Sequence, residues 1–441
     1  MSFPRYPEYK ESGVEWLGEV PAHWDVTPGR RLFRQDRTPA LPEDEQLSAT
    51  QKYGVIPQKL FMELEDQKVT LALSGLENFK HVEGGDFVIS LRSFQGGIER
   101  SEHAGCVSPA YTVLKPDSSL HGRFWSYLLK SKGYIEALQS MTDGIRDGKS
   151  ISYGQFGAIL IPTVPTAEQT AIAAFLDRET AKIDALVAEQ RRLIELLKEK
   201  RQAVISHAVT KGVNPDAPMK DSGIEWLGEV PAHWDIAGLT KYIPVLVDYR
   251  GRTPTKVDDG VFLVTAKNIR DGKIDYSASE EFIAENEYED VMRRGKPEIG
   301  DVLFTTEAPL GQVANVDRRD VALAQRIIKF RGEPGVLDNY FLKYWLMGTF
   351  AQSDMEQLAT GSTALGIKGS KVGQIRLCLP PYNEQVSIAR FLDDELDNLD
   401  TLTAEAQRAI DLLQERRSAL ISAAVTGQID VRHLAPAPQA E

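Results

Sequence analysis

The apolar positions between residues 168 and 210 recur at the spacing of one face of a long helix. They are Leu176, Ile183, Leu186, Val187, Leu193, Ile194, Leu197, Val204 and Ile205. Prolines at 162 and 165 disfavour helix before this stretch, and Gly212, Pro215 and Pro218 follow it. The pattern predicts a helix of roughly forty residues, about 60 Å long at 1.5 Å per residue. A helix of that length cannot cover its own apolar face, so it requires a partner helix.

The sequence contains that partner as a second copy of the pattern. The copy lies 216 residues further along, between residues 384 and 426. Both copies begin with Glu-Gln, continue with Phe-Leu-Asp and end with Ile-Ser-x-Ala-Val-Thr. Leu176, Ile183, Gln190, Leu197 and Val204 of the first copy correspond to Leu392, Leu399, Ala406, Leu413 and Leu420 of the second. We therefore expect an antiparallel coiled coil, which returns the C-terminal end of the chain to the N-terminal part.

A second repeat lies outside the helices. Residues 10–25 read KESGVEWLGEVPAHWD, and residues 220–235 read KDSGIEWLGEVPAHWD, so that only two of sixteen positions differ. We call these segments the tryptophan motifs, since they hold four of the six tryptophans. One interpretation is structural: two indoles and a proline turn fix an extended segment onto a core, with His23 and His233 hydrogen-bonded. The other interpretation is a patch that binds a partner protein.

The blocks that follow the motifs, roughly 26–165 and 236–382, are not obviously similar to each other. Each alternates short strand-like and helix-like stretches, and each ends in a glycine-rich loop, a short strand and two prolines. The predicted fold class is α+β. We expect two globular mixed α/β domains separated by two long helices, in a tandem duplication with pseudo-twofold symmetry. The expected boundaries are 1–165 for the first domain, 166–212 for the first helix, 213–382 for the second domain, and 383–441 for the second helix and a tail.

The net charge of −13 argues against a simple DNA-binding protein. The acidity is concentrated in residues 383–441, which hold 5 basic and 11 acidic residues, so a local basic surface remains compatible with the two blocks. The sequence has no apolar run of membrane-spanning length and no signal-like apolar core at its start, and its two cysteines are far apart. These features predict a cytoplasmic protein without a membrane association. Composition alone favours a scaffold that binds proteins.

Two stretches resemble catalytic motifs but lack an essential residue. Residues 143–150 resemble a phosphate-binding loop, but Asp143 stands where the first glycine belongs, and residues 151–157 predict a poor helix. Residues 379–382 resemble the Asn/Asp-Pro-Pro-Tyr site of amino-methyltransferases, but Leu379 cannot accept a hydrogen bond from a target amine. No set of nucleophile, base and orienting residue is evident either. We therefore expect a non-catalytic chain with no cofactor and no metal of its own.

The complete pattern resembles the specificity (S) subunit of type I restriction–modification enzymes. The resemblance rests on the repeated Gly-x-Glu-Trp-Leu-Gly-x-Val-Pro-x-His-Trp segment and on the Pro-x-x-Glu-Gln…Phe-Leu-Asp starts of both helices. Residues 89–98 with 107–111 look like one family type of recognition domain. Residues 251–254, 265–273 and 300–306 look like another. The resemblance covers essentially the whole chain.

This resemblance implies a function that composition does not show. Each block would be a target-recognition domain that reads one half of an asymmetric, bipartite site in double-stranded DNA. The helices would set the spacing of the halves and dock two methyltransferase (M) subunits, which would carry S-adenosylmethionine. A restriction and translocase (R) subunit would join the complex to cut DNA.

Side chains that read base edges or phosphates are mostly Arg, Lys, Asn, Gln, Ser and Thr from loops or helix ends. On this basis the candidates in the first block are Arg92, Ser93, Gln95, Arg146, Lys149 and Tyr153. Those in the second block are Arg250, Arg252, Lys267, Asn268, Arg270, Ser362, Thr363 and Lys368. For each of them the alternative is a solvated surface residue or a residue that stabilises a turn.

Two further functions remain possible at this stage. One is a non-catalytic coiled-coil scaffold with two protein- or glycan-binding modules. A salt-dependent shift of duplex DNA by the complex distinguishes it from a DNA-recognition subunit. The other is a self-contained enzyme, which turnover by the purified chain would reveal.

Overall fold

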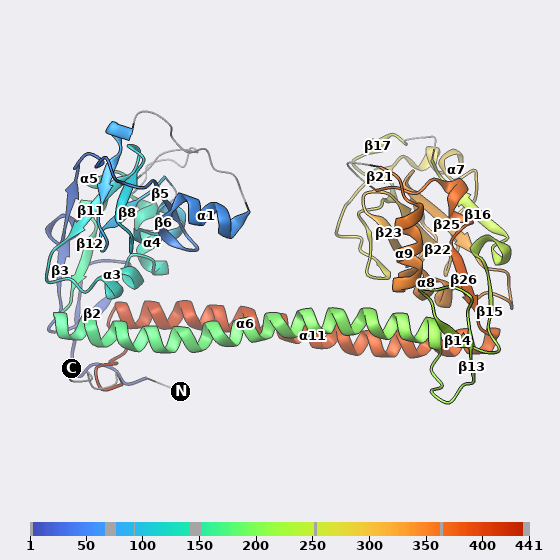
Figure 1. Cartoon of the computed structure of the whole chain (residues 1–441). Coiled ribbons are helices and arrows are strands. Elements are labelled where there is room, and N and C mark those ends of the chain that lie inside the picture. Colours follow the sequence, from blue (N-terminus) through green and yellow to red (C-terminus); the bar gives the residue numbers. More distant parts are fainter. Residues whose placement is uncertain are drawn as a thin grey trace. The chain divides into compact units, whose positions relative to one another are not determined.

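The computed structural model describes residues 3–66, 76–91, 93–141, 151–250, 254–361 and 365–434 (Figure 1). The chain forms two compact units. Unit 1 consists of Met1–Gln190 with Arg408–Glu441, and unit 2 consists of Arg191–Gln407. Each unit therefore holds one tryptophan motif, one block and a part of each long helix. Within the described ranges, no helix is long and apolar enough to cross a membrane.

The elements of unit 1 are mostly short. Its strands are β1 (Tyr9–Glu11), β2 (Glu19–Pro21), β3 (Asp25–Pro28), β4 (Phe33–Asp36), β5 (Leu47–Thr50), β6 (Gly54–Pro57), β7 (Lys80–Val82), β8 (Phe87–Ile89), β9 (Glu99–Arg100), β10 (Gly105–Val107), β11 (Thr112–Pro116) and β12 (Leu160–Thr163). Its helices before the long pair are η1 (Gly29–Arg31), α1 (Gln58–Glu65), η2 (Leu76–Asn78), α2 (Ser93–Gly96), α3 (Gly122–Leu128), α4 (Lys132–Ser140) and α5 (Tyr153–Ala158).

Unit 2 has a second set of short elements. Its strands are β13 (Met219–Asp221), β14 (Glu229–Pro231), β15 (Asp235–Gly238), β16 (Val245–Asp248), β17 (Lys256–Val257), β18 (Val261–Val264), β19 (Ile269–Arg270), β20 (Lys273–Ile274), β21 (Phe282–Ile283), β22 (Val302–Thr306), β23 (Leu310–Asn315), β24 (Val321–Leu323), β25 (Ile327–Arg331) and β26 (Arg376–Leu379). Its short helices are η3 (Leu239–Tyr242), η4 (Glu285–Glu287), α7 (Tyr288–Val291), α8 (Asn339–Met347), α9 (Thr349–Leu358) and α10 (Gly369–Val372). The long helices are α6 (Thr166–Lys211) and α11 (Tyr382–Val425).

The two blocks share a fold although their sequences differ. The first contains an antiparallel sheet of order β4-β11-β8-β9, and the second contains the sheet β16-β25-β22-β23. The central strands β8 and β22 are fully buried, and each lies between the next strand in the chain and the third strand after it. Short strands in a common sheet order require only buried apolar residues of suitable size, so sequence comparison of the blocks does not reveal the common fold. The second block adds a sheet, β17-β21-β18-β24, in which β18 and β24 are parallel.

The ends of the two blocks also correspond. Helices α3, α4 and α5 lead into β12, as α8, α9 and α10 lead into β26. Strand β12 pairs with β3, and β26 pairs with β15, so that each tryptophan motif continues into a pair with the last strand of its block. The expectation of a poor helix at residues 151–157 was wrong, because α5 forms there. Its start is a capping box in which Ser152 and Gln155 satisfy each other's backbone N–H, and Phe156 is buried.

The long helices are antiparallel in both units, as predicted. In unit 1, Arg417 of α11 donates from Nε to Asp184 of α6 at 2.8 Å. In unit 2, Arg201 of α6 pairs with Asp400 of α11. An advance of 17 residues along α6, from Asp184 to Arg201, thus matches a return of 17 along α11, from Arg417 to Asp400. Because Asp400 and Arg417 lie 216 residues after Asp184 and Arg201, the duplication has repeated one ion pair.

The apolar face of the helices is only partly covered. The predicted seam positions Leu176, Ile183, Leu197, Leu392, Leu399 and Ala406 are buried. Leu186 and Leu193, which the apolar pattern also includes, are 48% and 41% exposed. They lie beside the seam, because the buried and half-buried stripe follows Ile183, Val187, Gln190, Ile194 and Leu197 at helical spacings of three and four. The exposed Leu186 and Leu196 have exposed counterparts at Leu402 and Leu412 in the second copy.

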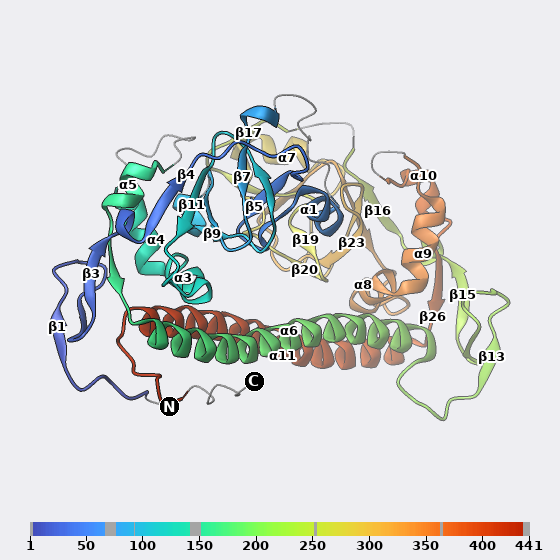
Figure 2. The ribbon, with the colours of Figure 1, turned by 60° about the vertical axis from the view of Figure 1, so that its left-hand side comes forward.

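Each long helix is fixed to its block by its first turns. Buried Gln169 accepts at Oε1 from the backbone N–H of His121 at 2.8 Å and from Nε1 of Trp125 at 3.0 Å, and its Nε2 donates to the carbonyl of Val164 at 2.7 Å. Gln385 repeats two of these bonds in unit 2, since it accepts from the N–H of Asp338 and donates to the carbonyl of Pro380. Its third bond goes to the carbonyl of Val336 in place of an indole. The block thus holds the helix in a defined orientation (Figure 2 shows α3 beside the start of α6).

The aspartate of the Phe-Leu-Asp sequence makes a second repeated contact, about two helical turns after the glutamine. Asp177 accepts from the hydroxyl of Tyr127 at 2.7 Å and pairs with Arg123. Asp393, its counterpart, accepts from Tyr344 and lies 3.5 Å from Lys343. The shared glutamine and aspartate near the start of each long helix are therefore explained by contacts with the blocks.

The C-terminal end returns to the first block, as expected. The N–H of Asp430 donates to the carbonyl of Pro4 at 2.8 Å, and the hydroxyl of Tyr9 donates to the carbonyl of Gly427 at 3.1 Å. Gly427 has φ +76° and lies so close to Pro21 that an added Cβ would meet it at 2.4 Å. This close approach requires glycine.

We predict that Gln169→Ala destabilises unit 1 strongly. The change leaves two buried N–H donors and one carbonyl without partners, at about 1 kcal/mol or more each. A total of about 3 kcal/mol corresponds to a fall of roughly 6–12 °C in the unfolding midpoint of a unit of this size. Gln414→Ala on exposed helix surface is the matched control and should shift the midpoint little. Equal midpoints for the two variants in a thermal scan would contradict the role of Gln169.

Candidate nucleic-acid interface

Both central strands begin after a Gly-Asp pair that forms the same turn. A side-chain oxygen of Asp86 accepts from the N–H of Glu83 at 2.9 Å, and a side-chain oxygen of Asp301 accepts from the N–H of Glu298 at 2.9 Å. Both carboxylates are almost fully buried, at 4% and 1% exposure. Each therefore needs a cationic partner from the neighbouring strand.

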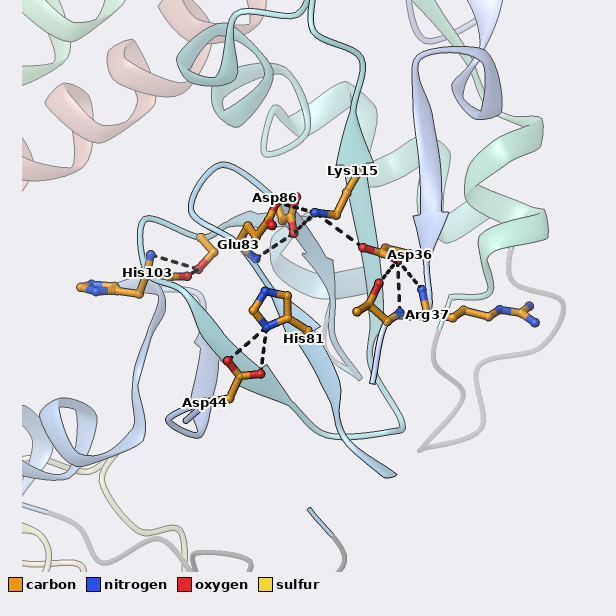
Figure 3. A network of polar contacts seen from close by, with 10 residues as sticks. Asp36, Arg37, Asp44, His81, Glu83, Asp86, His103 and Lys115 are labelled. Atoms are coloured by element: carbon orange, nitrogen blue, oxygen red, sulfur yellow. Dashed lines mark hydrogen bonds and ion pairs between the residues drawn. The ribbon is translucent and has the colours of Figure 1, made fainter. Parts of the chain in front are cut away.

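In the first block this partner is Lys115, which lies among three carboxylates (Figure 3). Its Nζ is 2.5 Å from Glu83, 3.6 Å from Asp36 and 3.8 Å from Asp86. The hydrogen bond from Lys115 lowers the pKa of Glu83, whereas burial raises the pKa of Asp86. The charge of Lys115 is thus shared among carboxylates, and Lys115 is not available to a phosphate.

In the second block the corresponding carboxylate is better paired. Arg331 donates to both oxygens of Asp301, at 2.6 and 2.9 Å, and buried Lys329 lies 3.1 Å away. Burial alone raises the pKa of Asp301, but the hydrogen bonds from Arg331 and the charge of Lys329 hold it below its usual value. These cations stabilise the sheet and, like Lys115, are engaged internally.

A different set of charges gathers at the opposite end of β22. The strand ends at Thr306, whose carbonyl accepts from the N–H of Ile367 at 3.0 Å, which places exposed Lys368 at this end. Arg250 lies here too, because an added Cβ on Gly369 would meet its Nη2 at 2.5 Å. Two candidates from distant parts of the sequence are therefore brought together.

Ion pairs hold the cations of this end in place. Arg250 donates from Nε to both oxygens of Asp248 at 3.0 Å, and Arg326 pairs with Glu307 at 3.0 Å. The side chains of Arg250 and Arg326 remain 39% and 49% exposed. With Lys368 they form what we call the sheet-end cluster: Asp248, Arg250, Glu307, Arg326 and Lys368. It carries three positive and two negative charges, and its guanidinium groups retain donors that face solvent.

Arg326 was not among the candidate residues. The candidates were sought in loops and at helix ends, whereas Arg326 directly precedes strand β25. Only the position of β25 beside β22 shows that Arg326 lies at the same end as Lys368. No local signal in the sequence marks this proximity.

The candidates between β18 and β19 have a different setting. Asn268 is fully buried, and its Oδ1 accepts from the N–H and hydroxyl of Thr265 while its Nδ2 donates to the carbonyls of Asp275 and Ser279, all within 2.8–2.9 Å. This geometry favours the turn-stabilising interpretation for Asn268. Lys267 and Arg270 are exposed on the same segment.

The hairpin of β19 and β20 connects the second block to the long helices. Lys273 of β20 lies 3.1 Å from Asp400 and 3.5 Å from Asp397 of α11, and Arg201 of α6 donates to the carbonyl of Asp271 at 3.1 Å. Arg270 therefore lies on an element whose polar contacts are with α6 and α11.

The candidates of the first block are divided. Ser93 is buried and its hydroxyl accepts from the N–H of Ser90 at 2.9 Å, and the hydroxyl of Tyr153 donates to the carbonyl of Phe33 at 2.9 Å. Gln95 is exposed on α2. Six candidates lie outside the described residues: Arg92, Arg146, Lys149, Arg252, Ser362 and Thr363.

Three of the histidines lie beside carboxylates. His81 lies 2.8 Å from Asp44 (Figure 3), and His23 and His233 lie 2.9 and 2.7 Å from Glu168 and Glu384 of the long helices. Across the described ranges, no three His, Cys, Asp or Glu side chains converge in a geometry that could hold a metal ion. The hydrogen-bonded role expected for His23 and His233 is confirmed.

Comparison with known proteins shows the fold and a similarity to one family of proteins. Residues 257–412 match the family model of the type I restriction modification DNA specificity domain. The chain is 23% identical over 336 residues to the specificity subunit of the type I restriction enzyme EcoKI from Escherichia coli K12, covering 74% of this chain and 69% of that protein. It is 24% identical over 289 residues to the MjaVIII specificity subunit of Methanocaldococcus jannaschii, covering 63% and 64%. The chain is a relative of these type I specificity subunits.

Solved structures agree with this relationship at the level of the fold. The HsdS subunit of Thermoanaerobacter tengcongensis superposes with a TM-score of 0.54 at 16% identity, covering 92% of this chain and 98% of that one. A chain from a study of assembly and conformational transition in a type I restriction–modification system gives a TM-score of 0.64 at 15% identity. The predicted fold class of a specificity subunit, two mixed α/β domains and an antiparallel pair of long helices, is confirmed.

We predict that Asn268→Ala destabilises unit 2, whereas Lys267→Ala does not. Loss of the Asn268 amide leaves the N–H of Thr265 and two carbonyls without partners, at a cost of about 3 kcal/mol. A surface change at Lys267 should remain within about 0.5 kcal/mol. Hydrogen exchange of the amide of Thr265 measures the difference directly. Wild-type protection in Asn268→Ala would show that the side chain is not needed for the turn.

Proposed function

We propose that the chain is the sequence-specific DNA-recognition subunit of a type I restriction–modification complex. Each block reads one half of a bipartite site in double-stranded DNA. The observation that carries this proposal is the common sheet of the two blocks, which presents different polar residues at the end of its central strand. Two readers with one scaffold and different side chains recognise different half-sequences, so the complete site is asymmetric.

In the second block we assign DNA contact to the sheet-end cluster. Arg250 and Arg326 keep exposed donors of the kind that pair with guanine or phosphate, and Lys368 adds a point charge. Lys267 and Arg270 are further candidates, with Arg252, Ser362 and Thr363 on the same block. In the first block, Gln95 is the exposed candidate among the described residues, and Arg92, Arg146 and Lys149 join it in the proposal.

The subunit itself is non-catalytic and works with partners. Two methyltransferase subunits supply S-adenosylmethionine and the methyl transfer, and a restriction subunit supplies cleavage. The exposed leucines Leu186 and Leu412 in unit 1, and Leu196 and Leu402 in unit 2, support docking of partner helices on the long pair. The compartment of this work is the cytoplasm, where the host DNA lies.

Exchange of one block tests the assignment of half-sites. Replacing residues 26–165 by the corresponding block of another specificity subunit should change one half of the methylated sequence and leave the other half and the spacer intact. Methylome sequencing of a host that carries the complete complex returns both halves at once. The reciprocal exchange of residues 236–382 is the matched control and should change the other half. Loss of both halves, or no change, would refute the domain assignment.

The length of the long helices tests their role in spacing. Four residues inserted in α6 after Gln190 add roughly one turn, or about 6 Å. We expect the complex to accept a different spacer while both half-sequences stay the same. The same four residues added after Leu434, beyond the end of α11, serve as the control and should change nothing. An unchanged spacer would leave the helices with a bracing and docking role only.

A further inference from the structure

The tryptophan motifs are more alike than their structural role requires. Fourteen of sixteen positions are identical, although the blocks that follow share no obvious sequence similarity. Burial explains Leu17, Val20 and Trp24, which correspond to the buried Leu227, Val230 and Trp234. Positive φ explains the glycines: Gly13 and Gly18 have φ +70° and +60°, and Gly223 and Gly228 have φ +71° and +65°.

Neither burial nor positive φ explains why the exposed glutamates of residues 15–19 and 225–229 are the same in both motifs. Glu15 and Glu19 are exposed in unit 1, as are their counterparts Glu225 and Glu229 in unit 2. The side chains of Glu15 and Glu225 make no hydrogen bond or ion pair with any residue that the structure describes. Between the two carboxylates lies a tryptophan, and Trp226 is 51% exposed. An indole that could be buried but is half in water is typical of an interface anchor.

The surroundings of the two tryptophans have diverged while the loop edge has not. Trp16 donates from Nε1 to the carbonyl of Leu160 at 3.2 Å and packs edge-on against Tyr134, beside an open cleft of about 710 Å³. Trp226 instead stacks on Phe350, with the guanidinium of Arg376 4.5 Å from its ring centroid. The feature kept in both units is the Glu-Trp-Leu-Gly-Glu edge itself, so the requirement that preserved it acts on that edge.

We propose that residues 15–19 and 225–229 are two copies of one docking surface, and that each binds a methyltransferase subunit. This inference rests on the proposed function and adds to it the surface by which the partner is held. Two surfaces on one chain that share the Glu-Trp-Leu-Gly-Glu edge suit a partner that is present twice. Two carboxylates that flank an indole fit a basic surface with an apolar or cationic centre, through ion pairs and cation–π contact. The same carboxylates repel phosphate, which excludes DNA as the occupant.

Charge reversal at the loop edge tests the docking surface in the complete complex. Glu15→Lys, Glu225→Lys and the double variant are co-expressed with the methyltransferase subunit, and native mass spectrometry counts the subunits bound. Each single variant should lower the occupancy of one of the two methyltransferase sites, and the double variant should lower the occupancy of both. The dissociation constant of each altered site should rise by about tenfold or more.

Matched controls separate docking from general charge effects. Glu63→Lys in unit 1 and Glu333→Lys in unit 2 make the same change at exposed glutamates outside the motifs, and both should keep two subunits. Thermal unfolding of the variant chains confirms that the fold is intact, because exposed substitutions change stability little.

Each outcome decides between the inference and the function on which it rests. A double variant that binds two methyltransferase subunits as tightly as the wild type overturns the docking surface. If that complex also methylates its DNA site, the proposed function stands without it. A wild-type chain that binds no methyltransferase subunit overturns both. Self-association of the isolated wild-type chain that the double variant loses would assign the surface to a second copy of this chain and overturn the proposal.

Discussion

The structure depends on covering an apolar stripe that runs along a helix of 46 residues. No single helix can hide such a stripe, and the antiparallel copy does so in both units. The repeated ion pair, Asp184 with Arg417 and Arg201 with Asp400, is half-exposed, and pairs of that kind contribute only about 0–1 kcal/mol. The leucines of the seam contribute several times more through burial. The seam therefore supplies the stability, and the ion pairs specify the register.

The seam alone does not orient the blocks, which explains why the residues shared by the starts of the long helices contact the blocks. A seam determines how two helices meet but leaves open which way a globular domain faces. Gln169 and Gln385 remove that freedom, because each satisfies three backbone or indole groups that burial would otherwise leave unpaired. Glu168 adds the tryptophan motif to this connection, since it accepts from Trp24 at 2.9 Å and lies 3.5 Å from Arg432.

The duplicated contacts are not fully identical. The indole of Trp24 is bonded to Glu168, whereas that of Trp234 has no hydrogen-bond partner among the described residues. Arg432 completes the charge set around Glu168 in unit 1, and unit 2 has a continuous chain at the corresponding place, from Gly212 to Met219. In unit 1 the C-terminal segment after α11 thus reaches the tryptophan motif through non-covalent contacts. In unit 2 the chain itself connects the end of α6 to the tryptophan motif.

The sequence predicted the long helices and their pairing from a periodic apolar signal, and it predicted the mixed strand and helix content of each block. It did not predict that the two blocks share a sheet order, since that order follows from pairing between strands distant in sequence. It missed α5 because Gly154 and Gly157 lower the helix propensity of residues 151–157, and a capping box defines the helix. Among the site residues, Arg250 and Lys368 could be nominated by type and position. Arg326 could not, because only the sheet brings it to them.

The acidic net charge of −13 remains compatible with DNA recognition once the cations are sorted by their partners. Lys115, Lys329, Arg331 and Arg376 neutralise buried or half-buried carboxylates, so they stabilise the blocks and cannot neutralise phosphates. The sheet-end cluster carries a net single positive charge, enough for a few specific contacts. Each neutralised phosphate contributes about 0.9 to the slope of log affinity against log salt concentration. A few phosphate contacts therefore give weak DNA binding that depends little on salt. The proposed function therefore assigns the choice of sequence to this chain and expects most phosphate contacts to come from the subunits that dock on it.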